Sequence, residues 1–217
     1  MAAGWQSGSS GKHNPAPMDT TLEIENRQQA CILRLRSEDG TNRLTGRTVL
    51  SLTETIRQLA ADNRPLIITG NEHFFSAGAD LNEIAALRGP SAYEFARMGQ
   101  ELMQVVESFP APVCAAIFGY CMGGGLDLAL ACHHRIASPH AVFGHRGAAL
   151  GVITGWGGTQ RLPRLVGKAQ ALQMFVTAEK IRADHALRIG LIDGIADDPV
   201  TEALQRSPLS QIIREDA

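Results

Sequence analysis

Short apolar runs alternate with amphipathic segments through most of the chain. Runs of strand length lie at residues 31–35, 66–69, 113–118, 135–138 and 191–195. Helical periodicity, with apolar positions three or four residues apart, marks residues 48–61, 92–108, 124–132, 159–165, 169–177 and 183–189. Strands that alternate with helices predict an α/β fold, in which helices pack on a mostly parallel sheet.

The first part of the chain lacks this periodicity. Residues 1–21 are rich in Gly, Ser, Pro and Asn, and SGSSG at 7–11 is typical of a flexible linker. We therefore expect a disordered or tag-like segment at 1–21, one folded domain at 22–198 and a short helical tail at 199–217. A chain of 217 residues is long enough for one domain with a continuous core.

Composition and charge argue against several classes of function. The formal net charge of -2, with both signs scattered along the chain, provides no basic surface for nucleic acid. No run of about 18 apolar residues could span a bilayer, and the N-terminus lacks the apolar region of a secretory signal. We expect a cytoplasmic protein without nucleic-acid or membrane partners. The four cysteines lie among apolar residues without a C-x-x-C pair, which predicts buried thiols.

A first candidate for chemistry is the segment HFFSAGADL at 73–81, between a predicted strand and a helical pattern that begins near Leu81. Gly78 allows the backbone to turn tightly there. Asp80 and Glu83 have the spacing of a capping box, which favours a structural role for Asp80 over catalysis. The functional interpretation concerns the backbone, because the N–H of Ala79 can point at a carbonyl oxygen.

A second candidate is the segment GYCMGGGLD at 119–127, a turn from a strand into a helix. Its consecutive glycines allow a ligand to approach the main chain closely, and the helix N-terminus adds a positive dipole. The N–H of Gly124 would then face negative charge developing on a thioester oxygen. The glycines alone are also consistent with tight packing of a helix on a sheet, since they complete neither a Walker nor a dinucleotide-binding motif.

Together with GWGGTQRLP at 155–163, these two segments resemble in order and spacing the enoyl-CoA hydratase/isomerase (crotonase) family. The resemblance covers roughly residues 31–198 and is strongest over 113–195. It implies the ClpP/crotonase-like fold of repeated ββα units and an acyl-CoA thioester as substrate, in fatty acid metabolism. It further implies no additional cofactor, no metal, a homo-oligomer (a trimer or a dimer of trimers) and a C-terminal helical segment shorter than is usual.

The resemblance also implies roles for particular residues. The N–H groups of Ala79 and Gly124 would form an oxyanion hole. The residues expected to bind substrate or coenzyme A are Ala77, Gly78, Asp80, Leu81, Gly123, Gly147 and Trp156. Trp156 stands where the family commonly has a small residue, so its indole either reshapes the acyl pocket or packs as an ordinary core side chain.

The two glutamates used by hydratases of the family are both replaced here. Asp127 matches the first and keeps a carboxylate with one methylene less. It is a candidate acid or base, or alternatively a residue that complements the helix dipole. Gly147 matches the second, where it offers no side chain to move a proton. A two-carboxylate hydration is therefore not the expected mechanism.

Histidine is the candidate substitute for the missing glutamate. Alternation along an extended segment gives His145 the same face as Gly147, whereas Arg146 would point away. The ordinary pKa of histidine suits proton transfer near neutral pH, and a hydrogen-bonded structural histidine is the alternative interpretation. His133 and His134 do not predict a metal site, because adjacent side chains diverge.

Three functional hypotheses follow from these residues. The leading one is an enzyme that hydrates or isomerises an enoyl-CoA through a thioester enolate, with Asp127 as the main proton-handling group. One carboxylate can suffice for isomerisation, because a single base can remove and return a proton. The alternatives are a non-catalytic acyl-CoA-binding or scaffold homologue and a thioester hydrolase or decarboxylase of the same fold.

Overall fold

The computed structural model describes the backbone of residues 19–215 and the side chains of residues 19–207. The disordered segment expected at 1–21 therefore lies, up to residue 18, outside the described residues. At its other end the expectation differs from the structure, because strand β1 (Thr21–Asn26) begins at Thr21. The side chain of Thr20 is buried and donates a hydrogen bond to the carbonyl of Arg43.

The larger sheet has six strands in the order β1-β2-β4-β7-β9-β12. After β1 these are β2 (Cys31–Arg36), β4 (Leu66–Thr69), β7 (Val113–Ile117), β9 (His134–Ala137) and β12 (Gly194–Ile195). β1 runs antiparallel to β2, and the other neighbouring pairs are parallel. The expected α/β class with a mostly parallel sheet is confirmed.

Two smaller sheets carry the loops that matter for function. One contains β5 (Phe74–Ser76), β8 (Tyr120–Met122), β10 (Val142–Gly144) and β11 (Ile181–Arg182) in the order β11-β10-β8-β5. The other pairs β3 (Arg43–Leu44) in parallel with β6 (Gly78–Ala79). These strands have only two or three residues each, too few to produce a recognisable alternation in the sequence.

The helices lie close to the positions that their periodicity predicts. They are α1 (Gly46–Leu59), α2 (Leu81–Ala86), α3 (Pro90–Glu107), α4 (Gly124–Ala131), α5 (Gly158–Val166), α6 (Lys168–Thr177), α7 (Ala183–Arg188) and α8 (Pro199–Glu215). Two 3₁₀ turns follow α1 and β10, namely η1 (Ala60–Asp62) and η2 (Gly147–Leu150). The strand expected at 191–195 is shorter than predicted, because Leu191 donates its N–H to Ala186 at the end of α7.

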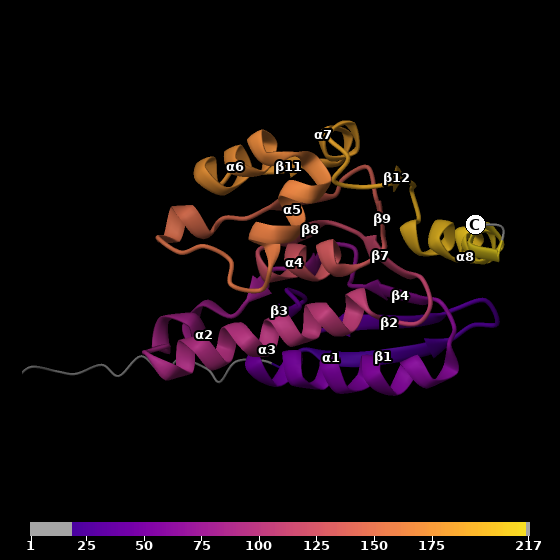
Figure 1. Ribbon diagram of the computed structural model, residues 1–217, viewed down its shortest axis with the longest axis horizontal. Coiled ribbons are helices and arrows are strands. Elements are labelled where there is room, and N and C mark those ends of the chain that lie inside the picture. Colours follow the sequence, from indigo (N-terminus) through magenta and orange to yellow (C-terminus); the bar gives the residue numbers. More distant parts are fainter. Residues whose placement is uncertain (1–18, 216–217) are drawn as a thin grey trace, which may run out of the picture.

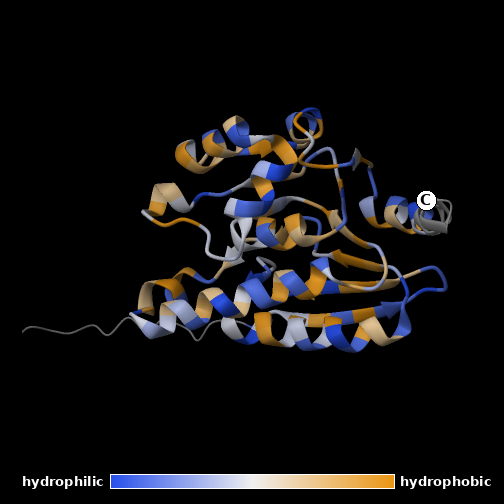
Figure 2. Ribbon diagram, in the orientation of Figure 1, coloured by the Kyte–Doolittle hydropathy of each residue, from blue (hydrophilic) through white to orange (hydrophobic). Residues whose placement is uncertain are grey.

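The larger sheet is covered on both faces, and its strand residues alternate between two cores. Leu33 and Ile68 face the main core with α1 and α3, whereas Ile32 and Ile67 face a smaller core that includes Ala203 of α8. Figure 1 shows α1 and α3 lying together along the lower side, with α5, α6 and α7 above. In Figure 2 hydrophobic residues dominate α4 and alternate with hydrophilic ones along α1 and α3.

Helix α4 is the central element of the fold. All eight of its residues are buried, which is typical of a helix enclosed by other elements on every side. The helix begins after strand β8, and its N-terminus lies at the pocket described below. A polar side chain or a free N–H at this end of the helix therefore lies in a largely apolar environment.

Candidate active site

A pocket of about 640 Å³ lies between the N-terminus of α4, the α2–α3 region and the segment that follows β10. Most of the predicted site residues line it: Ala77, Ala79, Leu81, Gly123, Gly124, Asp127, His145, Gly147 and Trp156. Gly78 and Asp80 are buried and are not among the lining residues. The structure thus brings together residues from segments separated by more than 60 positions in the sequence.

The turn before α4 presents a backbone amide to this pocket. Gly124 is the first residue of α4, so its N–H has no acceptor within the helix. Gly123 adopts a φ of 50° and donates its own N–H to the carbonyl of Gly144 at 2.9 Å, which ties the turn to β10. A Cβ built on Gly124 would lie 3.2 Å from the nitrogen of Ala79. The two predicted oxyanion-hole amides are therefore neighbours.

The segment around Ala79 is held by side-chain hydrogen bonds. The hydroxyl of Ser76 donates to the carbonyl of Asn42 at 2.7 Å and accepts the N–H of Gly78 at 3.0 Å. Gly78 has a φ of +94°, and a Cβ there would lie 2.6 Å from the carbonyl oxygen of Met122. Because a side chain at position 78 would collide with the turn before α4, glycine is required for the close approach of the two segments.

Asp80 caps helix α2, as its spacing predicts. Its Oδ1 accepts the N–H groups of Asn82 at 2.9 Å and of Glu83 at 3.1 Å. The capping box itself is not closed. Glu83 instead accepts the N–H of Gly46 at 2.8 Å, at the start of α1. Asp80 thus orients α2 beside the pocket, and Glu83 joins α2 to α1.

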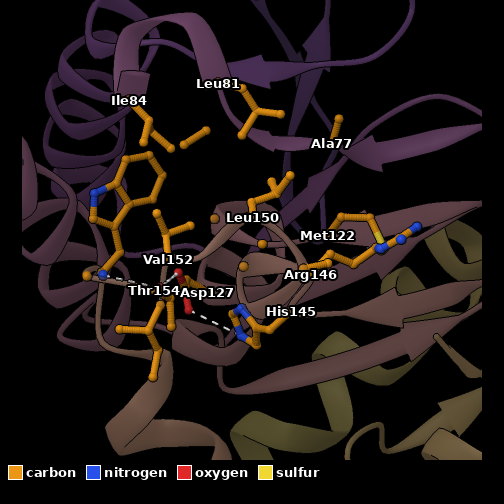
Figure 3. Close-up of a pocket in the computed structure, with 18 of the residues that line it drawn as sticks. Ala77, Leu81, Ile84, Met122, Asp127, His145, Arg146, Leu150, Val152 and Thr154 are labelled. Carbon is orange, nitrogen blue, oxygen red and sulfur yellow. Dashed lines mark hydrogen bonds and ion pairs between the residues drawn. The ribbon is translucent and has the colours of Figure 1, made fainter. Parts of the chain in front are cut away.

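Asp127 carries the only ionisable carboxyl among the described residues that line the pocket, and it is buried. Its Oδ2 accepts a hydrogen bond from the hydroxyl of Thr154, and its Oδ1 lies 3.5 Å from Nε2 of His145 (Figure 3). Burial raises the pKa of Asp127 from 3.8 to about 7, although Thr154, Arg161 and the backbone of Gly158 act in the opposite direction. The carboxyl is therefore suited to both accepting and donating a proton near neutral pH.

His145 follows directly after β10 and is buried beside Asp127. Its ring lies 5.2 Å from that of Phe175. Burial lowers the pKa of His145 from 6.5 to about 4, so the imidazole is neutral at pH 7. Arg146 also lines the pocket but is exposed. His145, rather than Arg146, lies next to Asp127, but the expectation that Arg146 points away is wrong, because the chain leaves the extended conformation at Arg146 and enters η2.

Position 147 has no room for a side chain. A Cβ built on Gly147 would lie 2.4 Å from the carbonyl oxygen of Val152. The N–H of Val152 donates back to the carbonyl of Gly147 at 3.0 Å, which closes the loop around η2. The position that a second glutamate would occupy is thus unavailable in this backbone conformation, and His145 is the titratable side chain that lies beside Asp127.

Trp156 forms one wall of the pocket and is also part of the core. The indole is 3% exposed, its Nε1 donates to the carbonyl of Phe95 at 3.2 Å, and the two rings lie 5.2 Å apart. A Cβ on Gly99 of α3 would lie 2.1 Å from the indole, and a Cβ on Gly124 would lie 2.5 Å from it. Both interpretations of Trp156 therefore hold, since it packs between two glycines and bounds the pocket.

Several residues of the site were not predicted from the sequence. Thr154, which holds Asp127, lies two positions before Trp156 in a Gly-rich stretch, and nothing in the local pattern indicates its partner. Gly99 could have been identified from the sequence, because glycine inside an amphipathic helix is costly and indicates close packing against a neighbouring element. Arg146 and Lys180 add two exposed cations to the pocket lining.

The contacts of His133 and of the cysteines indicate structural roles. Nδ1 of His133 accepts the N–H of Val113 at 2.9 Å, and all four cysteines are buried free thiols, as predicted. Among the side chains of residues 19–207 no group of three His, Cys, Asp or Glu is placed to hold a metal ion. No helix in the described part of the chain is long and apolar enough to cross a membrane.

The fold and the pocket define an α/β protein in which two Gly-rich turns and one buried carboxyl line a mostly apolar cavity. Residues 25–215 match the family model for enoyl-CoA hydratase/isomerase. The chain belongs to the enoyl-CoA hydratase/isomerase family, and the crotonase fold expected from its motifs is confirmed.

Individual relatives agree with this assignment. The chain is 45% identical over 160 residues to a probable enoyl-CoA hydratase of Bacillus subtilis, covering 72% of this chain and 62% of that protein. It is 38% identical over 175 residues to a crotonyl-CoA hydratase of Syntrophomonas wolfei, covering 79% and 67%. The structure of Pseudomonas aeruginosa DspI superposes with a TM-score of 0.82 at 36% identity, covering 89% of this chain and 76% of that one. The match thus spans less than two thirds of the Bacillus relative.

Proposed function

We propose that the protein adds water to the double bond of a 2-enoyl-CoA thioester, through an enolate held by the N–H groups of Ala79 and Gly124. The observation that carries this proposal is the arrangement of one pocket, in which the amide of Gly124 at the start of α4 neighbours that of Ala79 in β6, and the carboxyl of Asp127 lies one turn further along α4. The names of the two hydratase relatives support the same reaction.

The proposed roles follow from the chemistry of conjugate addition. Water attacks C3 of the enoyl group, and the thioester oxygen takes on negative charge that the two amides and the dipole of α4 stabilise. Asp127 removes the proton from the attacking water, and the resulting acid delivers a proton to C2. With a pKa of about 7, both forms of Asp127 are well populated at neutral pH. His145 lies beside the carboxyl and provides a second site for this proton.

Coenzyme A as the carrier of the acyl group is supported by the composition of the pocket. Its lining is mostly apolar around Leu81, Ile84 and Trp156, which suits an acyl chain. Arg146 and Lys180, both exposed, add positive charge that suits the phosphates of the carrier. No further cofactor enters the proposed reaction.

The test is turnover of a short enoyl-CoA by the purified protein, followed by loss of the conjugated thioester absorbance and by the mass of the product. We expect a product heavier by one water, and a decrease in turnover of about 10²-fold or more in Asp127→Asn. Asp184→Asn, which changes an exposed carboxyl on α7, is the matched control and should retain full turnover. A product of unchanged mass would instead identify isomerisation, and thioester binding without any turnover would support the non-catalytic binder.

A homo-oligomer, and a trimer in particular, remains part of the proposal. Leu172 and Val176 on α6 are 63% and 67% exposed, which is consistent with an apolar surface that a second copy covers. Light scattering on the purified protein tests this, with a monomer as the contradicting result. The cytoplasmic location stays a prediction.

A further inference from the structure

The two oxygens of the Asp127 carboxyl face different partners. Oδ2 accepts the hydrogen bond of the Thr154 hydroxyl, whereas Oδ1 faces Nε2 of His145 at 3.5 Å. Both Oδ1 and Nε2 are buried side-chain atoms that have no hydrogen-bond partner within the described residues. In Figure 3 Thr154 and His145 approach the carboxyl from two sides. The carboxyl is therefore asymmetric, with Oδ2 bonded to the Thr154 hydroxyl and Oδ1 facing the imidazole, while the backbone of Gly158 also favours its charged form.

The hydroxyl of Thr154 makes two hydrogen bonds that bear on where Asp127 takes up a proton. Its Oγ1 accepts the N–H of Trp156 at 3.3 Å and donates to Oδ2 of Asp127. A hydroxyl has one hydrogen, and here that hydrogen is directed at Oδ2. While Thr154 donates to Oδ2, that oxygen acts as an acceptor, which leaves Oδ1, next to the imidazole nitrogen, as the site for a proton.

We propose that Thr154 is a positioning residue that confines the titrating proton of Asp127 to Oδ1, so that Oδ1 and Nε2 of His145 act as one acid–base unit. The unit takes up a single proton, which lies either on Oδ1 or on Nε2. The two arrangements differ only by transfer of that proton between the two atoms. This inference rests on the proposed function for its catalytic meaning, but its structural content can be tested without turnover.

The surroundings of the pair favour this arrangement. Gly158 of α5 packs against both atoms, because a Cβ there would lie 2.1 Å from Oδ1 and 3.0 Å from Nε2. The other ionisable groups that interact with the carboxyl are Arg161, which favours its charged form, and the Cys121 thiol, whose pKa is raised well above its usual value, mainly by burial. Burial disfavours charge on either partner, so the arrangement with the proton on Oδ1, in which both groups are neutral, is the stable protonated form.

The test compares Thr154→Val, which keeps the branched shape and removes the hydroxyl, with Thr154→Ser, which retains it. The side-chain ¹³C signal of Asp127 and the ¹⁵N signals of His145 are followed by NMR from pH 5 to 9. In the wild-type protein and in Thr154→Ser, Nε2 should respond at the same midpoint as the Asp127 carboxyl. In Thr154→Val the Asp127 midpoint should rise by about one pH unit, because a hydrogen bond to the charged form is lost. Thr177→Val, at the exposed end of α6, is the control and should leave both signals unchanged.

The kinetic readout accompanies the spectra. In Thr154→Val the optimum of kcat should move to higher pH by the same amount, while KM is unchanged and Thr154→Ser restores the wild-type profile. The proposal is overturned if the wild-type Nε2 signal does not respond when Asp127 titrates, a result that requires no variant to fold. It is equally overturned if the Asp127 midpoint is the same in Thr154→Val. If the NMR results agree but no enoyl-CoA is turned over, the hydratase proposal fails while the positioning role stands.

Discussion

Replacing Asp127 by Asn should make the protein more stable at neutral and alkaline pH. The carboxyl is buried, and its charged form is poorly solvated there. Asn has nearly the same shape, its amide oxygen can accept the Thr154 hydrogen bond, and its NH₂ group can donate to Nε2 of His145. The substitution therefore removes the cost of burying a charge without leaving either neighbour unsatisfied.

The magnitude follows from the pKa of the carboxyl in the two states. Below pH 3.8 the group is protonated in both the folded and the unfolded chain. As the pH rises to about 7, the unfolded chain has lost this proton while the folded protein retains it, so the wild-type protein loses stability. At about 1.4 kcal/mol for each tenfold change in proton affinity, the loss reaches about 4 kcal/mol. The stability of Asp127→Asn relative to wild type should rise by up to this amount between pH 4 and pH 8.

Urea denaturation of both proteins at intervals from pH 4 to pH 8 measures this difference. His145 has the opposite dependence, because its lowered pKa costs stability as the pH falls from 6.5 to about 4, so its contribution is confined to the acidic part of the range. Asp184→Asn is the control. Its carboxyl has a pKa lowered mainly by the hydrogen bond from Arg188, so the sign of its pH dependence is reversed. A difference for Asp127→Asn that stays constant across the range would refute the reasoning.

Three further substitutions test the packing of the site. Gly124→Ala should lower turnover by about 10²-fold, because its Cβ would lie 2.5 Å from the Trp156 indole and displace the amide that we propose holds the enolate. Adding Trp156→Ala should recover part of the loss. Gly147→Glu should not raise hydration activity and should lower the free energy of unfolding by about 1–3 kcal/mol, as seen in urea, because its Cβ would collide with the carbonyl of Val152. Gly99→Ala should cost a similar amount despite the higher helix propensity of Ala, and should cost less in a Trp156→Ala background.

The long elements of the fold were predictable because their physical signal is local. The apolar run at 66–69 coincides with β4, and the periodicity of α1 and α3 marks the faces that contact the core. The short strands β3, β6 and β8 were not predicted, since they are held by pairing with distant partners rather than by their own composition. β6 carries Ala79 and β8 leads into α4. The position of the site therefore depends on short strands that the sequence pattern does not predict.

The candidate site shows the same division. Ala79, Gly124 and Asp127 were recognisable because they lie in motifs, and alternation pointed to His145 although the chain leaves the extended conformation at Arg146. The hydrogen bond from Thr154 to Asp127 joins positions 27 residues apart across a Gly-rich loop, and no periodicity encodes such a contact. A resemblance to a family can identify the segments of a site, but it does not give the pairings between side chains where the family pattern has changed.

The departures from the family pattern are accommodated by glycines on neighbouring elements. The indole of Trp156 fits because Gly99 on α3 and Gly124 on α4 both lack a Cβ at the point of contact. The Asp127–His145 pair fits because Gly158 leaves space beside both atoms. Gly99 lies outside the three motifs, so the bulky residue at 156 depends on a position that motif matching does not include. A family member with tryptophan at the equivalent position should therefore also carry glycine, or a displaced α3, at the equivalent of position 99.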